Sequence, residues 1–201
     1  METFQEYLQK TESAAKILFQ GIDEYVRIID TVPLDDVGIT EEWRTAERRF
    51  LNESFAIATL CGAVLQLAYM AIMQYSNSGN IPEQFVDLIK KKPKPKKFCI
   101  GREIESAIPI GLIIYAGRNQ AAHYDDSNLC DLNKSIFENL CERTSRSGKK
   151  YRDPAFDLNN GITVIFAANI TSLLGWRSYD AYLQDILDML SNDETRPVGQ
   201  S

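Results

Sequence analysis

The only histidine of the chain, His123, stands five residues after Arg118 and four after Asn119. On an α-helix each residue turns about 100° around the axis, so these three side chains would share an arc of about 140° around the small Ala122. An imidazole transfers protons near physiological pH, a guanidinium binds phosphate oxygens through a planar fork, and an amide can orient either partner. The spacing therefore indicates acid–base chemistry on a phosphate ester.

Cleavage of an RNA strand is a reaction that this set of groups can perform. Without a metal ion, the 2′-hydroxyl must lose a proton, the leaving 5′-oxygen must gain one, and the added charge on the phosphate must be neutralised. We assign His123 as the acid–base group, Arg118 as the electrostatic clamp and Asn119 as the positioning residue. These three are the candidate catalytic residues.

The stretch Arg118-Asn-Gln-Ala-Ala-His123 resembles the Arg-Asn-x-x-x-His signature of HEPN domains, a family of small helical bundles. Many members are metal-independent endoribonucleases of prokaryotic toxin–antitoxin and antiviral systems. The resemblance covers about residues 40–190, of which the six-residue motif is the specific part, and it implies RNA as substrate and an antitoxin or defence-system protein as partner. Some HEPN toxins carry a modified tyrosine two residues after the histidine, where this chain has Asp125.

A single histidine per chain cannot form a two-histidine acid–base pair. A two-fold dimer that apposes the two motif helices would bring together His123, Arg118 and their symmetry mates. Gly111 and Ala122 project onto the same face, where small residues permit close approach. The HEPN resemblance implies the same arrangement, since the active cleft of those nucleases is usually formed across a homodimer. We therefore expect a homodimer.

Candidate substrate contacts flank the motif. Six lysines stand between Lys90 and Lys97, where two prolines and repelling charges argue against a helix. Such a loop either tethers phosphates near the cleft or is a plain solvated loop. A tyrosine near the motif could stack on a base, although core packing is the simpler interpretation of Tyr115. The candidate substrate-binding residues are Tyr115, Tyr124, Lys94, Lys96 and Lys97.

Two other functions compete with catalysis. A non-catalytic HEPN-like module would use the Arg118–His123 face to bind a nucleotide, RNA or a protein partner. A plain structural bundle with a chance motif would have these side chains buried and paired internally. If catalysis depends on His123 while binding does not, the nuclease is distinguished from the non-catalytic module.

Length and composition fit one globular domain. The 201 residues form a chain long enough for one core, and they carry a net charge of −6. Because six lysines lie between Lys90 and Lys97, the basic charge is concentrated there and is not spread over the whole chain. We expect one domain over 1–192, with an N-terminal helix and connection at 1–38, a HEPN-like core at 40–192 and a flexible tail at 193–201. The N-terminus lacks the apolar run of a signal peptide. Four unpatterned cysteines and one histidine make no zinc motif, so we expect free thiols, cytoplasmic localisation, no metal and no cofactor.

Hydrophobic periodicity predicts an all-α fold, an up-and-down bundle of five or six helices. The motif helix should begin between 103 and 107, capped by Ser106, and end near 124–126. Residues 143–152 should form a basic loop. Residues 55–73 carry no charge and are long enough to span a bilayer, but Thr59, Gln66 and several alanines favour the central helix of a soluble bundle, and we expect no membrane association. The other predicted helices cover 3–30, 41–75, 82–90, 132–142, 156–176 and 179–190.

Overall fold

The computed structural model describes residues 2–30, 41–77, 79–104, 107–124, 129–144, 148–159 and 165–191. This part of the chain is mostly helical, so the predicted all-α class is confirmed. Five of its helices are eleven residues or longer. The predicted cap Ser106, the connection at 31–40 and the tail at 193–201 lie outside the described residues.

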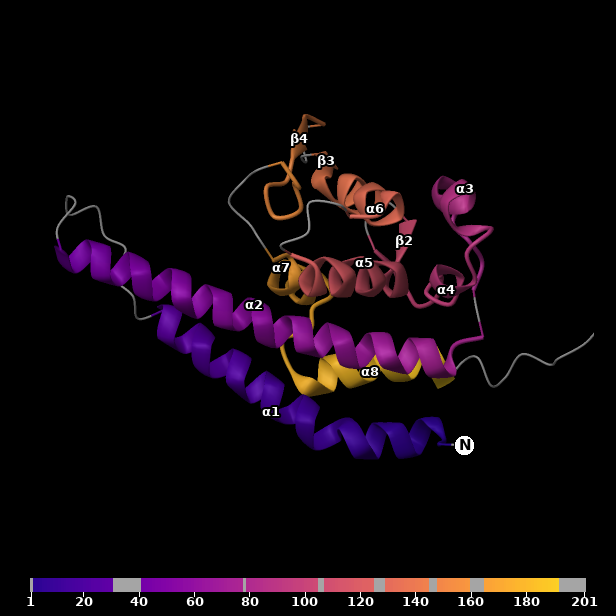
Figure 1. The fold of residues 1–201 in the computed structure, drawn as a ribbon, viewed down its shortest axis with the longest axis horizontal. Coiled ribbons are helices and arrows are strands. Elements are labelled where there is room, and N and C mark those ends of the chain that lie inside the picture. Colours follow the sequence, from indigo (N-terminus) through magenta and orange to yellow (C-terminus); the bar gives the residue numbers. More distant parts are fainter. Residues whose placement is uncertain are drawn as a thin grey trace, which may run out of the picture.

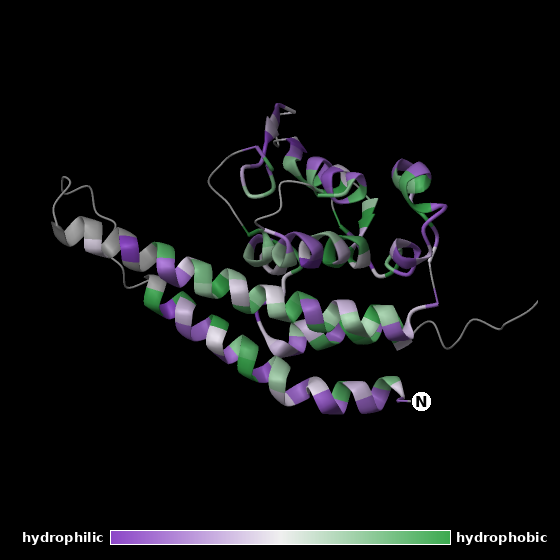
Figure 2. Cartoon of the chain, viewed as in Figure 1, coloured by the Kyte–Doolittle hydropathy of each residue, from purple (hydrophilic) through white to green (hydrophobic). Residues whose placement is uncertain are grey.

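Two long helices support the rest of the fold (Figure 1). α1 (Phe4–Asp30) and α2 (Glu41–Tyr75) pack against each other, and both match their predicted ranges. Along α1, hydrophobic residues recur between hydrophilic ones (Figure 2). The buried residues Tyr7, Ala15 and Phe19 belong to this apolar face. Burial of an amphipathic face, more than helix propensity, stabilises such a helix.

The apolar half of α2 is the central helix of the bundle. It contacts α1 on one side and α5 (Ile110–Ala122) and α7 (Ala167–Leu173) on the other (Figure 1). Buried residues recur every three or four positions, as at Cys61, Leu65, Ala68 and Ile72. By length and composition the segment Leu51–Tyr75 could also cross a membrane. In this fold the segment packs against α1 on one side and against α5 and α7 on the other.

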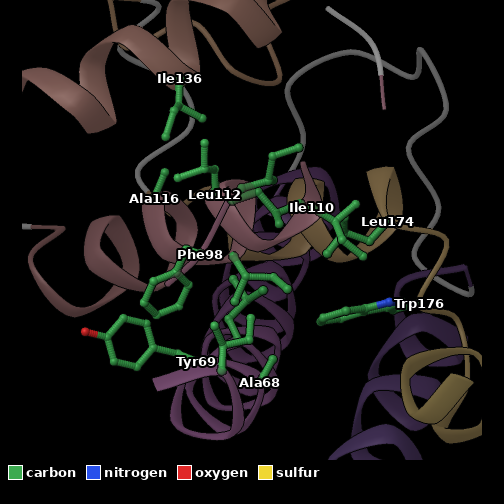
Figure 3. Packing of buried hydrophobic residues seen from close by; sticks show 14 of the residues in the cluster. Ala68, Tyr69, Phe98, Ile110, Leu112, Ala116, Ile136, Leu174 and Trp176 are labelled. Atoms are coloured by element: carbon green, nitrogen blue, oxygen red, sulfur yellow. The ribbon is translucent and has the colours of Figure 1, made fainter. Parts of the chain in front are cut away.

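α5 lies between α2, α6 (Asp131–Cys141) and α7, and it is buried along most of its length. Figure 3 shows three of its residues, Ile110, Leu112 and Ala116, within the core. A Cβ atom at Gly117 would overlap the end of the Ile170 side chain, so glycine at this position lets Ile170 of α7 pack directly on α5. The helix that carries the motif is therefore fixed on three sides.

The start of α5 is set by a short hairpin, β1 (Glu103–Ile104) paired antiparallel with β2 (Ile108–Pro109). The first amides of a helix need acceptors from outside it, and here Ile110 N donates to Arg102 O at 3.0 Å and Gly111 N to Ile100 O at 3.1 Å. The prediction that this helix begins at 103–107 was therefore wrong. Residues 103–104 and 108–109 pair with each other as strands, and the helix begins only at Ile110.

Arg102 ties this hairpin to the end of the chain. Its Nε and Nη2 donate to the two carboxylate oxygens of Asp185, each at 2.9 Å, and Nη2 also donates to Leu174 O at 2.7 Å. The same carboxylate accepts the indole N–H of the buried Trp176 at 2.8 Å. Asp185 belongs to α8 (Tyr179–Ser191), so one carboxylate joins the hairpin, the segment after α7 and the last helix.

The lysine-rich stretch contains a helical turn, α4 (Pro93–Lys96), which contradicts the prediction of no helix there. Both prolines lie in the first turn, where an amide hydrogen has no acceptor inside the helix and its loss costs little. Upstream, a 3₁₀ turn (Glu83–Phe85) and α3 (Val86–Ile89) confirm the short helix predicted at 82–90.

The later part of the chain departs from prediction twice. The expected loop at 143–152 contains a hairpin, β3 (Glu142–Thr144) with β4 (Lys150–Arg152), stabilised by Arg152 hydrogen bonds to Glu138 and Asp157. The expected helix over 156–176 is helical only in α7, and residues 160–164 lie outside the described part. α6 and α8 confirm the helices predicted at 132–142 and 179–190.

Candidate active site at the end of helix α5

His123 lies just beyond the last turn of α5. The helix ends at Ala122, and His123 takes the capping position with φ −132° and ψ 37°, its N–H donating to Gln120 O at 3.3 Å. The helix is thus shorter than the predicted end at 124–126, and the helical projection does not apply to the imidazole. The ring is exposed and has no hydrogen-bond or ion-pair partner among the described residues, so both nitrogens can reach a ligand.

The guanidinium of Arg118 is held in place by neutral groups. Nε donates to Gln66 Oε1 at 2.6 Å, and Nη1 donates to Asn119 Oδ1 at 3.3 Å. Its carbon lies 4.8 Å from the centroid of the Tyr69 ring, within cation–π distance. Among the described residues no carboxylate forms an ion pair with Arg118. Its positive charge is therefore oriented but not neutralised, as an anion site requires.

Asn119 follows Tyr115 by one turn of α5. Its side chain accepts a hydrogen bond from Arg118 Nη1 at 3.3 Å. Burial raises the pKa of Tyr115 above its ordinary value, and the nearby Asn119 side chain opposes that rise. The Tyr115 ring packs against the rings of Phe98 at 5.1 Å and Tyr69 at 6.2 Å between centroids. The structure therefore places Tyr115 in an aromatic cluster beneath the site.

Tyr69 is the residue that brings the lysine-rich stretch to the motif. Figure 3 shows Tyr69 and Phe98 next to each other at one edge of the core. The Lys94 ammonium lies 5.3 Å from the centroid of the Tyr69 ring, the same ring that Arg118 contacts. Two cations from separate parts of the chain thus gather on one aromatic side chain. Their combined field attracts anions to this edge of α5.

The other two candidate lysines are not drawn to this ring. Lys97 Nζ donates to Met73 O at 2.7 Å, which satisfies a carbonyl at the C-terminal end of α2. Lys96 is exposed, its carbonyl accepts the Cys99 N–H at 3.2 Å, and its ammonium opposes the rise that burial causes in the pKa of Cys99. Of the three lysines predicted to bind substrate, only Lys94 lies on the ring that Arg118 contacts.

A groove of about 320 Å³ runs between α2 and the end of α5. Arg118 and Tyr124 line it from the motif side, and Tyr124 meets the ring of Phe55 edge to face at 6.4 Å. Four α2 residues at helical spacing line the opposite wall: Phe55, Thr59, Gly62 and Gln66. The remaining lining residues are Ala58, Ala121, Ala122 and Ile165. His123 is not among the lining residues, so the imidazole lies outside the groove.

Sequence reasoning missed these α2 residues as site residues. The sequence marks Thr59 and Gln66 only as polar groups inside an apolar segment. Their positions, together with Phe55 and Gly62, follow the 4-3-4 spacing of one helix face. That periodicity is the signal that could have found them, although it does not reveal which helix the face contacts.

The expectation that Gly111 permits a second chain to approach is wrong. Gly111 is buried, and a Cβ atom there would overlap the carbonyl oxygen of Phe98 in the same chain. Its small size lets the backbone of Phe98 and Ile100, which precede the hairpin, lie against the first turn of α5. Ala122, by contrast, is exposed beside His123 and leaves the end of the helix open to close approach.

The four cysteines are free, as predicted, with Cys130 exposed and the other three buried. Within the described ranges, no three His, Cys, Asp or Glu side chains gather as metal ligands would. Comparison of the chain with protein-family models, curated proteins and solved structures gives no match.

Proposed function

We propose that the chain is a metal-independent endoribonuclease with a HEPN-like up-and-down bundle, acting on single-stranded or loop RNA in the cytoplasm. One observation supports this most strongly. An exposed imidazole follows, by five residues, a guanidinium that only neutral groups hold in place. Acid–base catalysis and phosphate binding need these two groups, and a purely structural arginine is commonly paired with a carboxylate.

The proposed reaction is a transesterification. The 2′-oxygen attacks phosphorus after losing its proton to an imidazole, the bond from phosphorus to the 5′-oxygen breaks, and an imidazolium protonates that oxygen. The products are a 2′,3′-cyclic phosphate and a 5′-hydroxyl. Arg118 stabilises the negative charge that gathers on the phosphate oxygens, and Asn119 fixes the position of Arg118.

The second imidazole comes from a second copy of the chain. One His123 per chain cannot both remove and supply a proton in the same step, and the exposed end of α5 at Ala122 and His123 is free to meet its symmetry mate. The proposal therefore includes a homodimer with the two motifs facing each other. An antitoxin or defence-system protein that covers this end would regulate it, and the proposal includes no membrane association.

The test is cleavage of single-stranded RNA in EDTA by purified protein, with analysis of the ends. We expect 2′,3′-cyclic phosphate and 5′-hydroxyl ends, and no cleavage of the same strand with 2′-O-methyl groups, because that strand lacks the nucleophile. Analytical ultracentrifugation should give the mass of a dimer. Cleavage of the 2′-O-methyl strand, or 5′-phosphate ends, would contradict the mechanism.

The second candidate is a non-catalytic binding module. The observation that favours it is that His123 is absent from the lining of the groove, whereas Arg118 is part of it. Such a module would bind RNA or a nucleotide through Arg118 and show no cleavage. Binding that persists in a His123→Ala variant, without cleavage by either protein, would favour this function.

A further inference from the structure

The groove between α2 and α5 has a polar end and an aromatic end. Arg118 and Gln66 lie at the first, and Phe55 and Tyr124 meet at the second. We propose that this groove holds one nucleotide unit of single-stranded RNA, with Gln66 as the positioning residue for Arg118 and the Phe55–Tyr124 pair as the contact for the base. This inference rests on the proposed function and adds residues to the site from a helix outside the motif.

The phosphate end is built by Gln66. Its Oε1 accepts the Arg118 Nε–H at 2.6 Å, so the Nε edge of the guanidinium cannot bind a ligand. Asn119 accepts one N–H of Nη1, so the other N–H groups of Nη1 and Nη2 remain for the end-on recognition of phosphate oxygens. An amide orients the guanidinium without neutralising it. A glutamate at the same position would compete with phosphate for the charge.

A second cation lies outside the groove, on the aromatic ring that Arg118 also contacts. Lys94 Nζ and the Arg118 guanidinium lie 5.3 and 4.8 Å from the centroid of the Tyr69 ring. We assign Lys94 to the next phosphate along the strand, because it is not among the residues that line the groove. Lysine and arginine contacts of this kind make binding sensitive to salt.

The aromatic end fits a base. Phe55 is 53% exposed and Tyr124 is 47% exposed, which is unusual for side chains of this size and leaves ring surface for stacking. Small residues line the groove between the two ends, namely Ala58, Gly62 and Ala121, and a Cβ atom at Gly62 would contact that of Ala121. A volume of about 320 Å³ lies at the lower end of the range for small-molecule sites.

Two polar groups on the α2 wall can contact the nucleotide. Thr59 Oγ1 donates its hydrogen to Phe55 O at 2.9 Å, so its lone pairs are left to accept a hydrogen bond from the edge of a base near Phe55. The Gln66 amide nitrogen has no partner among the described residues and can donate to a phosphate or ribose oxygen at the other end. Thr59 is therefore the α2 residue that would contact the base edge.

The test is binding of a fluorescent 2′-O-methyl oligoribonucleotide, which cannot be cleaved, measured by anisotropy. Gln66→Glu should weaken binding at least tenfold, while Gln74→Glu, the same charge change at an exposed site of α2, should change it less than twofold. Phe55→Ala should weaken binding about tenfold, as expected for the loss of one stacked base. Leu51→Ala, at a neighbouring exposed position of the helix, is its matched control.

Three results would overturn the proposal. The first is wild-type affinity in folded Gln66→Glu and Phe55→Ala proteins. The second is AMP or UMP binding as tightly as the oligonucleotide, which would assign the groove to free nucleotides. The third is a Phe55→Ala protein that becomes monomeric with unchanged affinity, which would show that a second copy covers the groove. The assay measures binding and not cleavage, so its outcome can be distinguished from the outcome of the nuclease test.

Discussion

Replacement of Asp185 by alanine should destabilise the whole bundle by about 2–4 kcal/mol. The carboxylate accepts the indole N–H of Trp176, which is 3% exposed, and a buried donor without an acceptor costs about 1–3 kcal/mol. It also accepts two hydrogen bonds from Arg102, whose side chain is 47% exposed. Water can replace Asp185 there, so this pair adds only about 1 kcal/mol.

Urea unfolding followed by circular dichroism measures this loss as a shift of the midpoint at constant slope. Asp185→Asn should cost less than Asp185→Ala, since the amide oxygen can still accept one of the bonds. Asp180→Asn, at an exposed site on the same helix, should change the free energy of unfolding by less than about 0.5 kcal/mol. If Asp185→Ala is no more destabilising than Asp180→Asn, the role assigned to this carboxylate is wrong.

Three further predictions concern single side chains. Tyr69→Phe keeps the ring and removes a buried hydroxyl that has no partner among the described residues, so urea unfolding should show an unchanged or slightly higher free energy of unfolding. Tyr69→Leu loses the ring that Arg118 and Lys94 contact, so it should lower the free energy of unfolding by about 1–2 kcal/mol. Hydrogen bonds from Arg152, and to a lesser extent from the Asn159 backbone N–H, lower the Asp157 pKa from 3.8 to about 2. The stability that Asp157 contributes is therefore present above its unfolded pKa and is lost as the pH falls through about 2. NMR titration should find the pKa of Asp157 raised toward its ordinary value in Arg152→Ala, and an unchanged low pKa would contradict the pairing. Lys94→Ala should reduce the salt dependence of RNA binding by about one unit of slope, and an equal or larger effect of Lys97→Ala would contradict the placement of Lys97 at the end of α2.

The sequence was sufficient for the helices whose stability depends on their own periodicity. α1, α2, α6 and α8 each bury one stripe or stretch of regular spacing, and their predicted bounds hold to within one or two residues. The start of α5 was missed because its first amides bond to carbonyls of Ile100 and Arg102, and nothing local in the sequence states that the chain returns there. The turn at Pro93–Lys96 was missed because proline was treated as a helix breaker without regard to its position in the first turn.

The candidate site could be predicted in part. The motif itself gave Arg118, Asn119 and His123, and the structure confirms that Arg118 and Asn119 are in contact. The partner of Arg118 was out of reach, because Gln66 lies 52 positions earlier and only the packing of α2 on α5 brings the two together. The position of His123 was misjudged for a different reason. Its backbone leaves the helix at that residue, so a projection that assumes a continuous helix gives the imidazole the wrong direction.

The measurement that tests the central claim most directly is the rate of RNA cleavage in EDTA by wild-type protein and by His123→Ala. Tyr151→Ala, which alters an exposed side chain on the β3–β4 hairpin, is the control for handling and contamination. His123 is exposed and unpaired among the described residues, so its variant should fold like the wild type, and analytical ultracentrifugation checks its dimer mass. We predict at least a hundredfold slower cleavage by His123→Ala and an unchanged rate for Tyr151→Ala. Equal rates for wild type and His123→Ala would contradict the assignment of His123 as the acid–base group.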